Sequence, residues 1–160
     1  MTKEELKRLV SYDPETGFLT RINDGAHRTN NMLPAGSKGA KAYIQIRLNG
    51  KIYSVHRLAW LISGCDLLAG YVIDHIDGNK LNNKLINLRA VTRSINCQNQ
   101  RKPMSNGTSG FLGVSRRGDR WIAKIMIEGT LRYIGIFAQP EIAYQAYLAA
   151  KRQHHEGCTI

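Results

Sequence analysis

Two alternating runs of apolar residues on either side of Asn49-Gly50 restrict the fold more than any other feature of this sequence. The apolar residues are Tyr43, Ile44, Ile46 and Leu48 before the pair, and Ile52, Tyr53 and Val55 after it. An Asn-Gly pair readily takes the positive φ angles of a tight turn that joins two antiparallel strands. Because a strand turns alternate side chains to the same face, the pattern predicts a β-hairpin with one buried face.

The start of the chain is predicted to be rich in β structure after one short helix. Thr2 and Glu5 have the spacing of a capping box, which predicts a helix at the amino terminus. Turn-forming residues at 13–17 then precede a predicted strand over 18–22. Residues 23–41 are rich in Asn, Gly and basic side chains, and we predict a long exposed loop there.

The end of the chain carries the pattern of a small sheet covered by a helix. Residues 103–110 are polar and contain Pro and Gly, so we predict a linker. Strands are predicted over 112–116, 121–127 and 130–137, with turns between them. Pro140 is suited to the first position of a helix, and the apolar residues that follow it would cover one face of the sheet.

The chain is strongly basic, which favours a polyanionic partner. It has 23 Lys and Arg against 12 Asp and Glu, a formal net charge of +11. The basic residues are scattered among predicted strands and turns rather than gathered in one tail, which suits a folded surface that follows phosphates. Charge alone also fits a protein kept in solution by self-repulsion, or one at an anionic membrane surface.

The cysteines and the lack of long apolar segments indicate where in the cell the protein is expected. The three cysteines have long, irregular spacings, which argues against a zinc knuckle or a disulfide framework. Residues 1–8 lack the apolar core of a signal peptide, and no stretch is apolar for long enough to span a bilayer. We therefore expect a cytoplasmic protein without a membrane partner.

Asp74 and His75 are adjacent at the end of an apolar run, before the turn-forming residues 77–79. Neighbours in a strand point to opposite faces, so one side chain could hold a metal ion while the other reaches a water. A carboxylate suits a hard ion such as Mg²⁺, and a neutral imidazole is the side chain best able to take a proton near pH 7. We therefore predict a metal ligand at Asp74 and a general base at His75.

A predicted helix after this strand supplies a further oxygen ligand. Thr92 is a plausible N-cap for a helix through Gln100, and Asn96 then lies one turn into it. A strand, loop, strand and helix of this length could fold back so that Asn96 faces Asp74. Phosphodiester hydrolysis needs an activated water, a charge sink and a stabilised leaving oxygen, and these residues could supply each part.

The segment from His56 to about Gln100 resembles the HNH nucleases of phage and intron homing enzymes. The motifs that carry the resemblance are Val55-His56-Arg57-Leu58, Asp74-His75-Ile76-Asp77-Gly78-Asn79, Asn82-Asn83, Asn87-Leu88-Arg89 and Val91-Thr92-Arg93-Ser94-Ile95-Asn96. The resemblance implies a ββα-metal core. In that core Asp74 and Asn96 bind one divalent ion, Mg²⁺ or Mn²⁺, His75 is the general base, and Asn87 braces the loop and orients His75.

The resemblance also implies an activity and partners. The implied activity is hydrolysis of double-stranded DNA to a 5′ phosphate and a 3′ hydroxyl, without a small-molecule cofactor. The implied protein is a monomer or homodimer that acts in a bacterial or phage-infected cell. Arg57, Arg89 and Arg93, close to the core motifs, are then expected to contact DNA. Asn96 stands where the family name has a second His, as in the Asn-terminated branch of the family.

The carboxyl-terminal part resembles the DNA-binding domain of the ethylene-response-factor type. The resemblance lies in Gly110-Phe111-Leu112-Gly113-Val114, Trp121-Ile122-Ala123-Lys124, Tyr133-Ile134-Gly135-Ile136-Phe137 and the predicted helix around residues 143–150. In that fold a three-stranded sheet enters the major groove. The expected DNA contacts are Arg116, Arg117, Arg120, Trp121, Lys124 and Arg132.

Together these patterns predict an α+β chain with an amino-terminal β-rich region, a central ββα-metal nuclease core, and a carboxyl-terminal three-stranded antiparallel sheet plus helix. The predicted parts are a DNA-contacting region (1–50), the nuclease core (51–102), a linker (103–110) and the DNA-binding domain (111–160). The rival interpretations are a sequence-specific DNA-binding regulator without nuclease activity and an RNA-binding accessory protein. The RNA-binding interpretation leaves Asp74, His75 and Asn96 unexplained.

Some residues have a simpler structural interpretation. We interpret Asn82 and Asn83 as ordinary loop residues, and His56 as a helix cap or a hydrogen-bonding core residue. Trp121 and Tyr133 fit packing within a sheet as well as contact with DNA.

Overall fold

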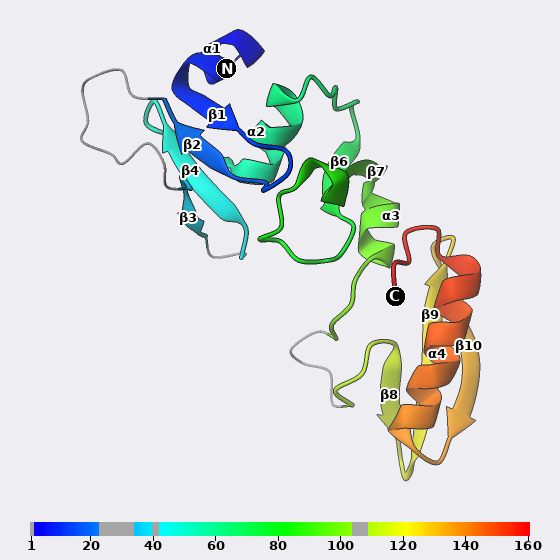
Figure 1. The fold of residues 1–160 in the computed structure, drawn as a ribbon. Helices are drawn as coiled ribbons and strands as arrows, with labels where there is room; N and C mark the ends of the chain where they lie inside the picture. Colours follow the sequence, from blue (N-terminus) through cyan, green and yellow to red (C-terminus); the bar gives the residue numbers. More distant parts are fainter. Residues whose placement is uncertain (1, 23–33, 40–41, 104–108) are drawn as a thin grey trace. The chain divides into compact units, whose positions relative to one another are not determined.

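The computed structural model describes residues 2–22, 34–39, 42–103 and 109–160. It has the mixed α+β composition that the sequence predicts (Figure 1). The chain divides into two compact units, Met1–Thr92 and Arg93–Ile160. The first unit carries Asp74 and His75, and the second carries Asn96 and the carboxyl-terminal sheet.

The first unit begins with a capped helix and a small hairpin. Helix α1 (Lys3–Leu9) has the predicted capping box, in which the Thr2 hydroxyl accepts from the Glu5 backbone N–H and the Glu5 carboxylate accepts from the Thr2 N–H. Strand β1 (Val10–Tyr12) follows directly and pairs antiparallel with β2 (Leu19–Arg21). The predicted helix and strand are both confirmed.

The Asn49-Gly50 hairpin is also confirmed. Strands β4 (Ile44–Leu48) and β5 (Lys51–Ser54) pair antiparallel, and Asn49 and Gly50 have φ angles of 46° and 77°. Two successive positive φ angles are what a two-residue turn of type I′ requires, and Asn-Gly adopts them at little cost.

The predicted loop over 23–41 is wrong at one place. Residues 37–38 form a short strand, β3 (Ser37–Lys38), which pairs antiparallel with β4 and extends its sheet to the order β3-β4-β5. The edge of β4 offers backbone N–H and C=O groups, and this pairing satisfies some of them, which a loop prediction from composition does not consider. Residues 23–33 and 40–41 of the predicted loop lie outside the described residues.

A single apolar core joins the amino-terminal strands to helix α2 (Val55–Ile62). Its buried residues are Leu6, Val10, Leu19, Ile46, Leu48, Val55 and Leu58. Burial of an aliphatic side chain of this size contributes about 1.5–3 kcal/mol relative to leaving it exposed. This core includes residues on both sides of position 50, so residues 1–50 share it with the start of the HNH-like segment.

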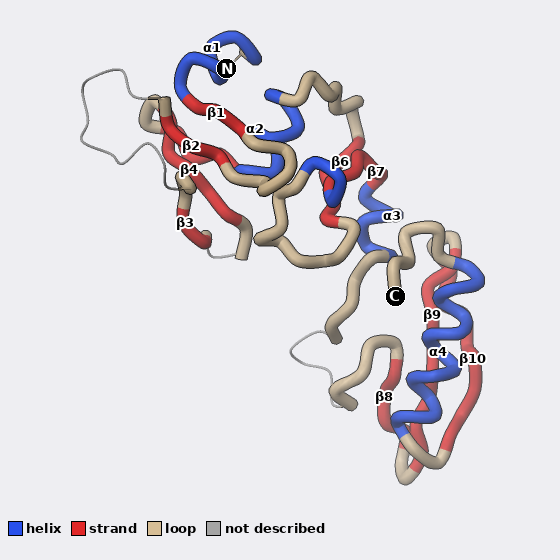
Figure 2. Tube along the Cα trace, in the orientation of Figure 1, coloured by secondary structure: helices blue, strands red, loops and turns tan. Residues whose placement is uncertain are grey.

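Strands β6 (Tyr71–His75) and β7 (Leu88–Thr92) form an antiparallel pair that carries the candidate catalytic residues. A second small core, made of Ala59, Ile73 and Leu88, packs this pair against α2. A loop over 76–84 and the short 3-10 helix η1 (Leu85–Asn87) connect the two strands, as Figure 2 shows.

The second unit begins with helix α3 (Arg93–Gln98) and then forms a sheet with a helix on one face. Strands β8 (Val114–Arg117), β9 (Arg120–Ile127) and β10 (Thr130–Phe137) are antiparallel in the order β10-β9-β8, and α4 (Pro140–His154) lies along them (Figure 1). The predicted three-stranded antiparallel sheet plus helix is confirmed.

One glycine fixes how closely α4 approaches the sheet. Gly113 has a φ of 73°, and a Cβ added there would overlap the ring of Tyr147 on α4. Tyr147 packs in a core with Val114, Ala123 and Ile125. Within the described part of the chain, no helix is both long and apolar enough to cross a membrane.

Candidate active site

Strand β6 ends with His75, whose side chain is buried at 3% relative exposure. Alternation along the strand places His75 on the same face as Ile73, which packs in the small core with Ala59 and Leu88. The His75 ring lies 5.2 Å from the ring of His56 and 5.9 Å from that of Tyr43, measured between centroids. The imidazole is therefore held by packing as well as by hydrogen bonds.

Burial also keeps His75 in the form that a base needs. Removal from water lowers the pKa of His75, although the hydrogen bond with Asn83 and the carboxylates of Asp77 and Asp74 oppose that effect. The pKa thus lies below its usual value, and the ring is neutral at neutral pH. A neutral imidazole can accept a proton from a water.

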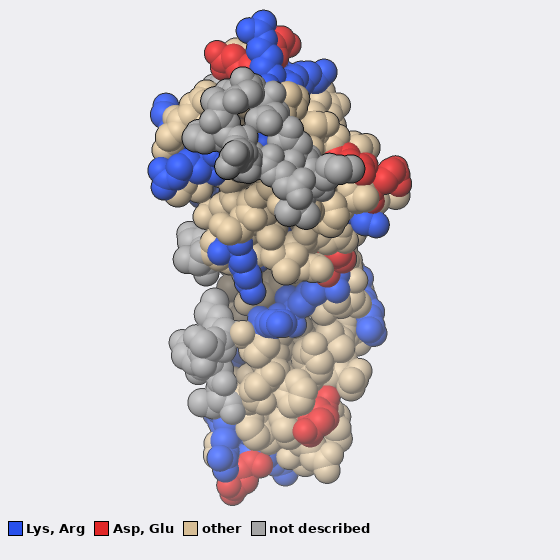
Figure 3. Space-filling view, turned by 60° about the vertical axis from the view of Figure 1, so that its left-hand side comes forward, with Lys and Arg blue, Asp and Glu red and all other residues tan. Residues whose placement is uncertain are grey.

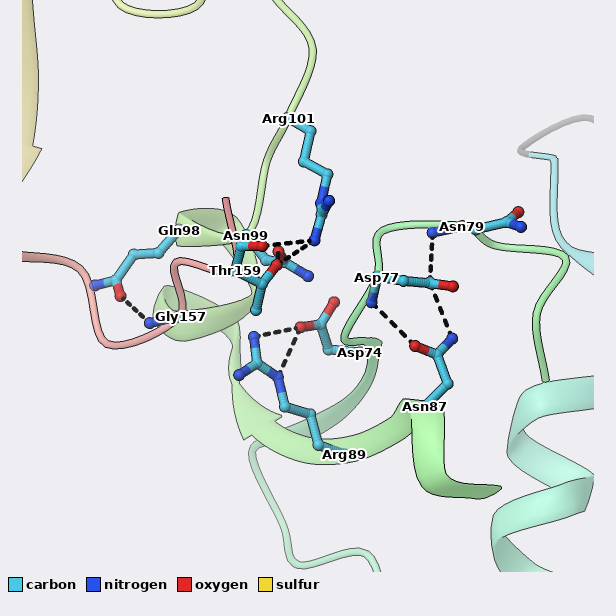
Figure 4. Close-up of polar contacts among 10 residues, drawn as sticks. All are labelled: Asp74, Asp77, Asn79, Asn87, Arg89, Gln98, Asn99, Arg101, Gly157 and Thr159. Carbon is cyan, nitrogen blue, oxygen red and sulfur yellow. Dashed lines mark hydrogen bonds and ion pairs between the residues drawn. The ribbon is translucent and has the colours of Figure 1, made fainter. Parts of the chain in front are cut away.

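Asp74 lies on the opposite face of β6 from His75 and pairs with Arg89 on β7. The two residues are Cα partners in the ladder, and Arg89 donates from Nε and Nη2 to the same carboxylate oxygen, Oδ2, at 3.0 and 2.9 Å (Figure 4). Their side chains are 8% and 25% exposed. A two-donor contact to a mostly buried carboxylate fixes its orientation. Contact of Arg89 with DNA remains a prediction.

Asn87 links the two ends of the 76–84 loop. Its Oδ1 accepts from the Asp77 backbone N–H at 3.0 Å, and its Nδ2 donates to Asp77 Oδ1 at 2.9 Å (Figure 4). Nδ2 also donates to the Asn82 carbonyl at 2.8 Å. The Asn87 carbonyl accepts from the Ile76 N–H at 2.8 Å. These contacts fit the brace that the sequence predicts at Asn87.

Asp77 is the centre of the same loop. Burial alone would raise its pKa, but hydrogen bonds from the Asn82 side chain, the Asn79 backbone and the Asn87 side chain lower it below the usual value. A carboxylate that accepts several hydrogen bonds stays ionised and orders the chain around it. The sequence pattern indicates a turn at residues 77–79 and assigns this role to none of them.

Asn83 is the residue beside His75 whose position sequence reasoning missed. The sequence favours an ordinary loop residue there, yet its side chain is buried and its Oδ1 lies 3.1 Å from His75 Nε2. The available signal was the Asn82-Asn83 pair, but composition does not tell which of two adjacent amides points inward. Asn82 instead contacts Asp77.

The prediction of a helix cap at His56 is wrong, because the N-cap of α2 is Ser54, and His56 is instead a buried residue of the core. It lies in the first turn of α2 and is buried, and within the described residues its Nδ1 has no hydrogen-bond partner. Burial, with smaller contributions from His75 and Arg57, lowers the pKa of His56 to about 4. The ring is therefore neutral at pH 7 and packs as part of the wall beside His75.

Asn96 lies on α3, in the second unit, and its approach to Asp74 remains a prediction. Several contacts within that unit hold α3 and the residues after it. Gln98 accepts from the Gly157 N–H at 3.0 Å, the Thr159 hydroxyl donates to Asn99 at 2.6 Å, and Arg101 donates to Thr159 (Figure 4).

The donor chemistry of the predicted ligands fits a hard divalent ion. Asp74 supplies a buried, oriented carboxylate, and Asn96 supplies an amide oxygen. Oxygen donors of these two kinds suit Mg²⁺. Among the residues that the structure describes, no three His, Cys, Asp or Glu side chains gather as a metal-binding group. The predicted set is of a different kind, since it combines one carboxylate with one amide.

The predicted DNA contacts lie at exposed or half-exposed positions. Those around the HNH-like segment are Arg57 on α2 and Arg93 on α3, both exposed. On the face that Figure 3 shows, Lys and Arg side chains lie at several separate places. The positions agree with the scattered basic pattern of the sequence.

The six predicted contacts in the second unit divide between the two faces of its sheet. Trp121 shares a face with Ala123 and Ile125, which pack against α4, and Arg116 stacks over the Trp121 ring at 6.0 Å on that face. Arg132 pairs with Ile125 on the same side. Strand alternation and the register between β8 and β9 place the other three on the opposite face, which α4 does not cover and which we call the open face. They are Arg117, Arg120 and Lys124.

Comparison with known proteins agrees with this geometry. Residues 53–98 match a family model described as HNH endonuclease, and the matched span includes Asp74, His75, Asn87 and Asn96. Residues 53–98 are therefore similar to HNH endonucleases. Enzymes of that family typically use one divalent metal ion.

Two phage proteins are similar to part of the chain. Protein 3.8 of Escherichia phage T7 is 41% identical over 76 residues, which are 46% of this chain and 62% of that protein. DNA endonuclease I-HmuI of Bacillus phage SP01 is 49% identical over 77 residues, which are 48% of this chain and 39% of that protein. The aligned regions span less than two thirds of the length of either relative.

A solved structure is also similar. It is described as DNA binding and cleavage by the HNH homing endonuclease I-HmuI, with 26% identity and a TM-score of 0.45, over 98% of this chain and 93% of that one.

Proposed function

We propose that the chain is a metal-dependent endonuclease that hydrolyses phosphodiester bonds of double-stranded DNA. The observation that carries the proposal is the buried, neutral His75 beside the oriented carboxylate of Asp74, at the end of β6 within the HNH segment. The likeness to a DNA endonuclease of a Bacillus phage supports the same class of substrate.

His75 is the proposed general base. Its neutral ring takes a proton from a water molecule, which then attacks the scissile phosphorus. A positioned general base typically accelerates such a step by about 10²–10⁴-fold. Packing against His56 and Tyr43 keeps the ring in one place, so little reorganisation is needed during the reaction.

Asp74 and Asn96 are the proposed ligands of one divalent ion, Mg²⁺ or Mn²⁺. When bound, such an ion neutralises charge that develops on the phosphate and the leaving 3′ oxygen. Arg89 holds the Asp74 carboxylate in one orientation, and Asn87 braces the loop that follows β6. The proposed products are a 5′ phosphate and a 3′ hydroxyl.

The remaining parts of the chain are proposed to hold the DNA. Residues 1–50 and 111–160 flank the nuclease core over 51–102, with a linker over 103–110. In the second unit, the open face of the sheet with Arg117, Arg120 and Lys124 is the better surface for a duplex, because α4 packs on the other face. Basic side chains there would neutralise phosphates and release counterions.

The proposed setting is a bacterial or phage-infected cell, where a homing-type endonuclease acts, and both similar proteins come from phages. One set of catalytic residues cuts one strand per encounter, so a monomer nicks and a homodimer, or two encounters, would be needed to break both strands.

A plasmid-nicking assay tests the proposal. We expect supercoiled plasmid to become nicked with Mg²⁺ and to remain intact with a chelator. The His75→Ala variant should lose cleavage by at least about a hundredfold but keep its affinity for DNA. If the wild-type chain binds DNA with normal affinity and never cleaves it with any divalent ion, the DNA-binding regulator is the better interpretation.

A further inference from the structure

Four large apolar side chains are exposed on the open face of the sheet in the second unit. Their relative exposures run from 41% to 57%, and we call them the apolar patch: Ile136, Met126, Leu131 and Tyr133. The register places Met126 opposite Leu131, and Tyr133 opposite Lys124, on the face away from the core that α4 covers. One exposed apolar residue is ordinary, but several that share a face indicate a contact surface.

The surroundings of the apolar patch are basic. Strands β8, β9 and β10 contain no Asp or Glu, and Arg117, Arg120 and Lys124 lie on the same open face. The partner that fits such a surface is an anion that also offers apolar groups. Duplex DNA offers both, because phosphates line its grooves and the C5 methyl group of thymine projects into the major groove. RNA lacks this methyl group, and its major groove is too narrow for side chains to enter.

The β9-β10 ribbon has dimensions that suit the major groove. The major groove of B-DNA is about 12 Å wide and admits a two-stranded β ribbon. Side chains on one face of a strand repeat at about 6.8 Å, which is twice the rise of about 3.4 Å between base pairs. Leu131 and Tyr133 are therefore spaced to meet bases about two steps apart, and Met126 lies beside Leu131 across the ribbon.

We propose that Met126, Leu131 and Tyr133 select thymine by contact with its C5 methyl group in the major groove. The proposal rests on the duplex-binding role given above to the open face, and it adds the base chemistry that this face prefers. The basic side chains of the face bind phosphates, which carry no sequence information, whereas the apolar side chains contact base edges. Burial of one methyl group strengthens binding by about fourfold, and burial of two by roughly fifteenfold.

Synthetic duplexes that differ in this methyl group test the proposal. Binding of the full chain is measured without divalent ions, so that no DNA is cleaved. We expect alternating poly(dA-dT) to bind at least about fourfold more tightly than alternating poly(dA-dU), which lacks only the methyl group. An inosine-cytosine duplex should bind as weakly as poly(dA-dU), and 5-methylcytosine in place of its cytosine should restore affinity, because the methyl group then returns to the major groove.

A variant of the apolar patch and a matched control locate the effect. Leu131→Ser removes an exposed side chain, so the fold should be retained, and the preference for thymine over uracil should fall towards one. The control Ile142→Ser removes an apolar side chain of 50% exposure from α4 and should leave the preference unchanged. Equal affinity of the wild-type chain for the thymine and uracil duplexes overturns the proposal, and so does an unchanged preference in a folded Leu131→Ser variant.

Other occupants of the apolar patch give different results. A second copy of the chain predicts a dimer in sedimentation that Leu131→Ser dissociates. A lipid surface predicts binding to phosphatidylglycerol vesicles that Leu131→Ser abolishes. Either result, together with equal affinity for the thymine and uracil duplexes, assigns the patch to that occupant and overturns thymine recognition.

The nuclease proposal and the thymine proposal fail in different ways. If plasmid is nicked with Mg²⁺ while the thymine and uracil duplexes bind equally, the nuclease proposal stands and thymine recognition is wrong. If thymine is preferred while no divalent ion supports cleavage, thymine recognition stands and the chain is better interpreted as a DNA-binding regulator.

Discussion

Replacement of Arg89 by Met should destabilise the chain because it leaves the Asp74 carboxylate without its guanidinium partner. Arg89 donates two charge-assisted hydrogen bonds to Asp74 Oδ2, and the Asp74 side chain is only 8% exposed. Removal of one member of a fully buried ion pair costs about 3–5 kcal/mol. Arg89 is 25% exposed, so water can reach part of the site and the cost is smaller. We expect a loss of about 2 kcal/mol in the free energy of unfolding.

This loss is measurable by urea or thermal unfolding. For a chain of this length, about 2 kcal/mol corresponds to a decrease of roughly 6 °C in the melting temperature. The matched control is Arg57→Met, which removes an exposed guanidinium from α2 and should change the stability by less than about 0.5 kcal/mol.

A double-mutant cycle separates the ion pair from simple loss of packing. In an Asp74→Asn background no charge is left buried, so Arg89→Met should cost less than about 1 kcal/mol there. Equal losses in the wild-type and Asp74→Asn backgrounds would refute the reasoning, because the effect would then come from the arginine stem rather than from the carboxylate.

Three further outcomes follow from contacts within each unit. Gly113→Ala should destabilise the second unit by at least about 2 kcal/mol, because the added Cβ overlaps Tyr147 at a positive φ; a melting temperature equal to wild type would contradict this. The pKa of His56 is lowered to about 4 in the folded state, so unfolding takes up a proton, and stability should fall by up to about 3 kcal/mol from pH 6.5 to pH 4; His56→Phe should flatten this part of the pH profile, and an unchanged slope would count against it. On the open face of the sheet, Lys124→Gln should weaken DNA binding and reduce its salt dependence by about one ion, more than Arg132→Gln on the helix-covered face; equal effects would favour a different docking surface.

The sequence was sufficient for elements whose structure is decided locally. The Asn49-Gly50 hairpin, the Thr2 capping box and the Pro140 helix start are predicted from sequence and confirmed, because each depends on backbone preferences within a few residues. The two-residue strand β3 is not predicted, because its strand conformation depends on pairing with the edge of β4.

In the candidate site, too, locally decided features were predicted and features that depend on distant contacts were not. Adjacent residues at a strand end predict that Asp74 and His75 lie on opposite faces, and alternation needs no knowledge of the rest of the fold. The Arg89 contact with Asp74 depends on the register between β6 and β7, which counting within one strand does not supply. The Asn83 carbonyl accepts from the Tyr12 hydroxyl, 71 residues earlier, and the composition of the loop could not reveal such a contact.

The amino-terminal hairpin, predicted to contact DNA, also contacts the loop that follows β6. The carbonyl of Pro14 and the close approach of Gly17 both act on the backbone of the loop that carries Asn83. A loop that is held by contacts from outside its own segment can stay ordered without a long rigid element of its own. The contacts that hold this loop thus include some from residues outside the matched segment 53–98, and a fragment limited to that segment would lack them.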